Sequence, residues 1–86
     1  MTARIKDEVE QIVGRRIVGV VIKHRDKPEA AVTSQLFLLF EDGSYYEFYT
    51  YNCSISTTGG VVQGGLNEVL AYMGDTLKPV FVKYQG

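Results

Sequence analysis

The sequence has very few of the residues that cross-link small proteins or hold metal ions. Its 86 residues include one cysteine, Cys53, and one histidine, His24. A disulfide needs two cysteines, and a structural zinc site draws its four ligands mainly from cysteine and histidine. We therefore expect no disulfide, no metal site and no cofactor. The single thiol also suits a reducing compartment.

Long apolar runs are missing as well. No run approaches the roughly 18 residues that a membrane-spanning helix requires. The first residues, MTARIKDEVEQ, alternate charged and apolar side chains, so they lack the apolar core of a signal peptide. We expect a cytoplasmic protein with no membrane contact.

An excess of positive charge is absent too. Nine lysine and arginine residues stand against ten acidic residues, which gives a net charge of −1. This balance argues against a general surface for nucleic acid. The chain also has no internal repeat and no linker between domains, so residues 1–86 are expected to form one domain. A domain this small buries little surface, and oligomerisation is a common way to stabilise one. We expect a protein partner or, with a second copy, a homodimer.

The clearest structural signal is QLFLLFEDGSYYEFYTY, residues 35–51, in which two apolar and aromatic runs flank Asp42-Gly43. Asp-Gly between such runs predicts a β-hairpin with a two-residue type I′ turn, because glycine tolerates the positive φ that this turn needs. That pairing places Leu38 opposite Glu47. One face of the hairpin would then contain Leu36, Leu38, Phe40, Tyr45, Glu47, Tyr49 and Tyr51. The other face, Phe37, Leu39, Tyr46 and Phe48, is almost purely apolar and is the predicted main core.

The rest of the chain predicts helices near both ends and further strands. Apolar spacing predicts an amphipathic helix over residues 2–13, with Thr2 as N-cap and Gly14 just after its end. Residues 16–24 read as an interior strand in which Gly19 marks a bulge or a close backbone approach, and a loop follows around Pro28. Residues 53–64 fit either strand or loop. A short helix over 66–73 precedes a last strand, whose Pro79 must lie at its beginning or at a sheet edge.

These elements predict an α+β fold. It comprises an antiparallel sheet of four to five strands, an N-terminal helix, and a short helix before the last strand.

Glu47 is the only acid inside a predicted strand. A carboxylate there must be exposed, hydrogen-bonded or paired with a cation, since unpaired burial costs several kcal/mol. It is interpreted either as a polar anchor in a binding site or as an edge-strand charge that discourages aggregation. With the aromatic side chains on its own face it forms the predicted binding site: Tyr45, Glu47, Tyr49 and Tyr51.

Catalytic and phosphate-binding patterns are weak. Cys53 and His24 are the only candidate nucleophile and base, and nothing in the sequence brings them together. GGVVQGG precedes a helix but lacks the Gly-Lys-Ser/Thr ending of a phosphate-binding loop. We expect no enzymatic activity.

The sequence therefore favours a non-enzymatic protein-interaction or regulatory module. Two alternatives stay open. One is single-stranded nucleic-acid binding through the strand tyrosines and a basic cluster containing Lys23 and Arg25, although Asp26 interrupts that cluster. The other is a small enzyme or ligand-binding domain that uses Glu47, His24 or Cys53.

Overall fold

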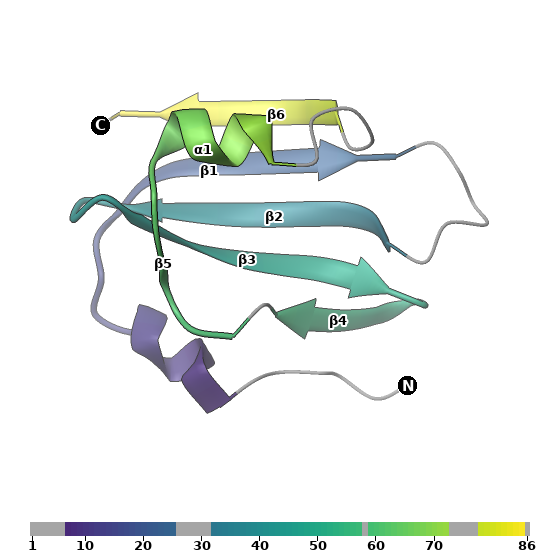
Figure 1. Ribbon diagram of the computed structural model, residues 1–86, viewed down its shortest axis with the longest axis horizontal. Helices are drawn as coiled ribbons and strands as arrows, with labels where there is room; N and C mark the ends of the chain where they lie inside the picture. The colour runs from purple at the N-terminus through teal and green to yellow at the C-terminus, as the bar shows by residue number, and fades with distance from the viewer. Residues whose placement is uncertain (1–6, 26–31, 58, 73–77, 86) are drawn as a thin grey trace.

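The structure is a computed structural model that describes residues 7–25, 32–57, 59–72 and 78–85. Its main feature is a six-stranded antiparallel sheet in the order β4-β3-β2-β1-β6, with β5 also paired to β3 (Figure 1). The strands are β1 (Ile17–His24), β2 (Val32–Phe40), β3 (Ser44–Tyr51), β4 (Ser54–Thr57), β5 (Val62–Gln63) and β6 (Lys78–Tyr84). The antiparallel sheet is as predicted, with one strand more than expected. The segment 53–64, left open by the sequence, supplies β4 and β5.

Helix is scarcer than the sequence predicted. The N-terminal helix is a 3₁₀ helix, η1 (Asp7–Ile12), and Thr2 lies outside the described residues. Gly14 has a φ of +85°, as expected for a glycine that ends a helix. The second helix, α1 (Leu66–Ala71), has only six residues. Helices this short are marginal on their own, and α1 is retained because Val69 packs into the core.

β1 lies between β2 and β6, so it is the interior strand that its sequence predicts. Gly19 combines both of its expected roles. The register with β2 shifts between Ile17 and Gly19, and a Cβ at Gly19 would lie 2.6 Å from Cδ1 of Tyr84 on β6. Glycine is therefore needed where the Tyr84 ring crosses β1. The predicted loop around Pro28 falls outside the described residues.

The hairpin forms, but the predicted two-residue turn is wrong. The strands end at Phe40 and Ser44, and the Gly43 amide donates to the Phe40 carbonyl at 3.2 Å. Gly43 has a φ of +83°. A four-residue turn closed in this way, with its last residue a glycine in the left-handed region, is the common three-residue hairpin loop. Asp42-Gly43 fits both loops, and the longer one moves the register by one residue.

This shift changes which side chains share a face. Leu38 pairs with Tyr46, and Glu47 pairs with Phe37 instead of Leu38. The predicted face is therefore divided, because one residue of slip turns a strand over relative to its neighbour. Leu36, Leu38 and Phe40 lie with Tyr46 and Phe48. The predicted binding residues Tyr45, Glu47, Tyr49 and Tyr51 lie on the other side, with Phe37 and Leu39.

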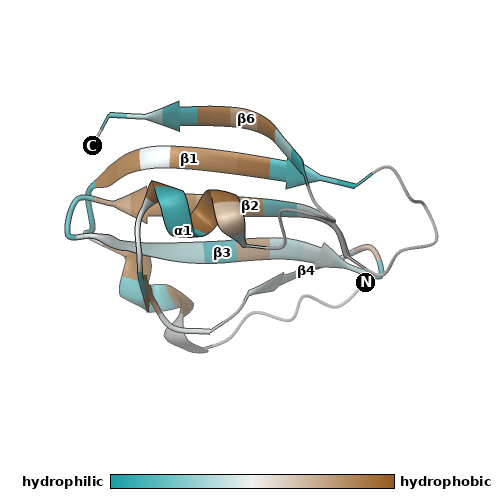
Figure 2. Ribbon diagram, turned by 45° about the horizontal axis from the view of Figure 1, so that its top comes forward, coloured by the Kyte–Doolittle hydropathy of each residue, from teal (hydrophilic) through white to brown (hydrophobic). Residues whose placement is uncertain are grey.

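Helix α1 covers one side of the sheet (Figures 1 and 2). Val69 packs there with Val21, Phe37 and Leu39, and Tyr45, Leu66 and Leu70 pack around this core. Aromatic edges complete it, since the Tyr45 and Tyr72 rings meet Phe37 at 5.9 and 6.1 Å between centroids. The predicted core thus holds for Phe37 and Leu39. Tyr46 is also fully buried, but on the opposite side with Phe48.

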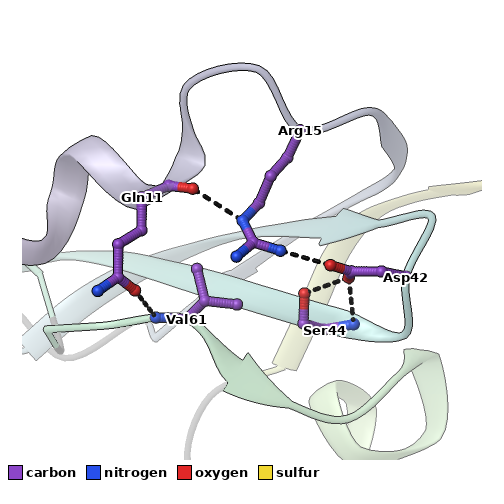
Figure 3. Close-up of polar contacts among 5 residues, drawn as sticks. All are labelled: Gln11, Arg15, Asp42, Ser44 and Val61. Atoms are coloured by element: carbon purple, nitrogen blue, oxygen red, sulfur yellow. Dashed lines mark hydrogen bonds and ion pairs between the residues drawn. The ribbon is translucent and has the colours of Figure 1, made fainter.

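Polar contacts attach the η1 region to the hairpin turn and to the segment before β5 (Figure 3). Arg15 donates to the Gln11 carbonyl at 2.7 Å and pairs with Asp42, whose carboxylate also accepts from the Ser44 amide and hydroxyl. The Gln11 side chain accepts from the Val61 amide at 3.1 Å. The Arg15 guanidinium also lies over the Phe40 ring, 5.7 Å from its centroid. These contacts explain how a single 3₁₀ helix holds its place beside the sheet.

Within the described part of the chain, no helix has the length and apolar character needed to cross a membrane.

Candidate interaction surfaces

The four predicted binding residues of β3 do lie on one side of that strand, but they do not form an open site. Glu47 is only 4% exposed, and Tyr45, Tyr49 and Tyr51 are partly buried. Tyr45 packs on Phe37, and a Cβ at Gly64 would lie 2.9 Å from its Cε1 atom. Much of this aromatic surface is therefore packed within the chain, on the side of the sheet that α1 covers.

Glu47 belongs to a buried polar cluster on the same side. The Gln35 side-chain amide on β2 donates to the Glu47 carboxylate, and Gln35 is itself 2% exposed. Burial raises the pKa of the Glu47 carboxyl, and the Gln35 hydrogen bond and the Lys23 charge offset only part of this effect. The other Gln35 side-chain atom, Oε1, has no hydrogen-bond partner among the described residues.

Lys23 on β1 is the cation of this cluster. Its Nζ atom donates to the main-chain carbonyls of Leu70, at 3.2 Å, and of Tyr72, and lies 5.6 Å from the centroid of the Phe37 ring. These carbonyls stand at the end of α1, where a helix leaves acceptors unsatisfied and favours positive charge. Burial lowers the pKa of the Lys23 amine, and the negative charge of Glu47 opposes that shift. The sequence assigned Lys23 to a basic surface cluster, whereas its side chain is fully buried.

The polar cluster therefore has a structural role. Lys23 fixes the end of α1 against β1, and Gln35 satisfies Glu47 on the neighbouring strand. Desolvation also raises the pKa of the nearby Tyr45 and Tyr72 hydroxyls, to which the Glu47 charge adds. Neither candidate for nucleophilic chemistry belongs to this cluster. Cys53 is exposed in the turn between β3 and β4, and the His24 imidazole is 3.0 Å from the Ser34 hydroxyl.

The opposite side of the sheet presents large apolar side chains, among them Phe48, which the sequence assigned to the main core. Cross-strand pairing aligns Phe81, Ile22, Leu36 and Phe48 in one row across four strands. Val20 and Leu38 lie in the next row. Phe81 is 50% exposed and Ile55 on β4 is 53% exposed, while the others are partly exposed. We call this set the apolar face: Val20, Ile22, Leu36, Leu38, Phe48, Ile55 and Phe81.

A shallow apolar hollow occupies part of the apolar face. Its volume is about 280 Å³, and side chains of Ile22, Leu36, Phe48 and Ile55 contribute to its lining. Contiguous apolar surface with a concave floor is typical of sites that bind other proteins or apolar groups. Correct hairpin register would have revealed this face in the sequence, since Leu36, Leu38 and Phe48 then fall on one side.

β6 is the second unusual surface. It is an edge strand, as the position of Pro79 allows, and all seven of its residues are exposed. Four of them have large apolar or aromatic side chains, and Figure 2 shows the hydrophobic stretch along the strand. These residues are Val80, Phe81, Val82 and Tyr84. Nothing in the sequence indicated this exposure, because VFV also fits a buried strand.

Comparison with protein-family models, with curated proteins and with solved structures finds no match to this chain.

Proposed function

We propose that this chain is a non-enzymatic protein-interaction module that binds a protein partner through the apolar face. The observation that supports this proposal most directly is the row Phe81, Ile22, Leu36 and Phe48, which crosses four strands and is only partly buried in its own chain. Exposure of such a sheet face to water is unfavourable. Its burial by a partner lowers the free energy by roughly 25 cal/mol per Å² of apolar surface.

The apolar character of this face favours a protein partner over a small polar ligand. The described residues that line its hollow include no charged side chain. A charged substrate or an anionic polymer would find no ionic contact in the hollow. An apolar protein surface would cover it without leaving a charge unpaired.

Nucleic-acid binding receives less support than it did from the sequence. That alternative combined the tyrosines of β3 with Lys23 and Arg25, but Lys23 is fully buried and its amine is bonded at the end of α1. An enzyme or ligand-binding domain built on Glu47 is also less supported, because the carboxylate is enclosed and bonded to Gln35.

Site-specific photo-crosslinking in the cells that make the protein tests this proposal. A photoreactive phenylalanine analogue at Ile55 lies on the apolar face, and the same analogue at Asn67 lies exposed on α1 as the matched control. We expect covalent adducts with another protein from position 55 and not from position 67. Absence of adducts from position 55, or equal adducts from both positions, would contradict use of this face.

A further inference from the structure

We propose that two copies of this chain join along their β6 strands, in antiparallel orientation about a two-fold axis at Val82. The two sheets would then continue into one another across β6. This inference concerns the edge of the sheet and is independent of the proposed use of the apolar face. Either one can fail without the other.

The backbone of β6 has polar groups that point toward the open edge, where they can pair with another strand. The Gln85 amide donates to the Val18 carbonyl at 2.8 Å, so the polar groups of residue 85 point toward β1. Backbone groups alternate in direction along a strand. Those of Tyr84 and Val82 therefore point away from β1, toward the open edge. Added strands bind such edges through main-chain hydrogen bonds, while side chains on alternating faces give specificity.

The side chains of β6 need cover on both faces of the strand. Val82 pairs with Val21 and so lies on the α1 side, whereas Phe81 pairs with Ile22 and lies on the apolar face. Val82 is 46% exposed and Val80 is 64% exposed. A helix or loop docked on one face would leave the other face in water. A neighbouring strand covers both faces at once.

The opposite edge shows how this chain protects a strand that does not pair. β4 has four residues, SIST, and three of them are serine or threonine. Short, polar edge strands discourage pairing with other chains. β6 has seven residues, and its apolar centre of Val80, Phe81 and Val82 lies between Lys78-Pro79 and Lys83. This longer apolar centre favours β6 over β4 as the edge that pairs with another strand.

The occupant that fits β6 is a second β6. With Val82 on the two-fold axis, Val82 faces its own copy and Phe81 faces Lys83 of the second copy; Val80, the extra residue where the register with β1 shifts, is left out of this pairing. Aromatic and β-branched cross-strand pairs are favourable, and a lysine beside an aromatic ring adds a cation–π contact. An axis at Lys83 would place two like charges directly opposite, which is unfavourable. β6 contains no acidic residue, so charge pairing does not favour a basic partner strand over a second β6.

Charge substitution at Val82 tests both the dimer and its symmetry. Light scattering should give a dimeric mass for the wild-type chain at high micromolar concentration. Val82→Lys and Val82→Glu each place like charges across the axis, so each alone should dissociate at least about tenfold more readily. Mixing the two variants should restore the dimeric mass, because opposite charges then face each other. The same substitutions at Val62, which is exposed on β5, are the matched control and should leave the mass unchanged.

Hydrogen exchange of the wild-type chain provides a test that needs no variant. The Val82 and Tyr84 amides should become more protected as protein concentration rises, whereas the Gln85 amide, already bonded to Val18, should change little. A monomeric mass at high micromolar concentration, or protection at residues 82 and 84 that does not change with concentration, would overturn the proposal. A dimer that persists in Val82→Lys would overturn it as well.

Discussion

The direction of the pKa shift at Glu47 determines how this residue makes stability depend on pH. Its folded pKa lies above the ordinary value of 4.5 because the carboxyl is buried. Between these two values the folded chain binds more protons than the unfolded chain, so the free energy of unfolding falls as pH rises. Above its raised pKa the folded chain must hold a buried carboxylate in its charged form, which costs stability.

Glu47→Gln removes this cost while leaving a carbonyl oxygen to accept from Gln35. We expect the stability of Glu47→Gln relative to wild type to rise as pH increases from about 4.5 through the raised pKa. Below about pH 4.5 the difference should not change with pH. Urea denaturation monitored at a series of pH values measures this difference. A difference that does not change with pH would show that Glu47 is not buried as a carboxyl group.

Glu68 is the matched control because its shift has the opposite direction. The Gly65 amide donates to the Glu68 carboxylate at 2.7 Å and lowers its pKa. The ionised form of Glu68 therefore stabilises the fold above its ordinary pKa of 4.5, and this contribution is lost as pH falls through the lowered value. Relative to wild type, Glu68→Gln should lose stability as pH rises, which is the reverse of Glu47→Gln.

Single residues also show where sequence reasoning reaches its limit for the site. The sequence indicated correctly that a buried Glu47 needs a hydrogen bond or a cation, and in the structure Gln35 donates that hydrogen bond. It did not predict the burial of Lys23, because the carbonyls that hold this lysine come from α1, 47 and 49 residues away. The chemistry that a residue needs is a local property. The group that satisfies it is set by tertiary packing.

At the scale of elements, the hairpin shows how a correct prediction can still misplace a surface. Asp42-Gly43 marked the turn and the positive φ of Gly43, but the loop starts one residue earlier, at Glu41. Both loop lengths place a glycine in the left-handed region, so the sequence alone does not choose between them. The choice moved Glu47 into the buried polar cluster and Phe48 onto the apolar face.

Gly43→Ala tests the strained position in this turn. Nothing lies within 4 Å of a Cβ built at Gly43, so the expected loss comes from the positive φ alone. We expect Gly43→Ala to lower the free energy of unfolding by about 1 kcal/mol. Gly43→Asn should lose less, because asparagine tolerates this backbone conformation better than alanine. Equal stability of wild type and Gly43→Ala in urea denaturation would be inconsistent with this turn.

At the scale of the whole molecule, the sheet has one side packed by α1 and another side that its described elements leave partly open. The sequence predicted the sheet, the short helix and a last strand with Pro79 at its beginning or at a sheet edge, in the observed order along the chain. It did not predict which side α1 covers, since that depends on the register of the hairpin and on the position of β6 beside β1. Both follow from contacts between segments far apart in the sequence, such as Tyr84 crossing Gly19.

The unequal packing of the molecule predicts unequal costs for one substitution made at three places. Val69 on α1 and Val21 on β1 are fully buried, whereas Val80 on β6 is 64% exposed. Changing Val69 or Val21 to alanine should therefore lower the free energy of unfolding by about 1–3 kcal/mol, through lost burial and the cavity left behind. Val80→Ala should change it by less than about 0.5 kcal/mol when measured at low micromolar concentration, where we expect the proposed dimer to dissociate.

The same three variants measured at high protein concentration separate packing within one chain from packing between copies. Stability gained through association increases with concentration, since mass action favours the dimer as more free chains are present. The cost of Val80→Ala should therefore grow with concentration, while the costs at Val69 and Val21 should stay the same. A cost at Val80 as large as that at Val69 in dilute protein would mean that β6 is packed within its own chain. In that case its exposed edge would no longer favour a second copy.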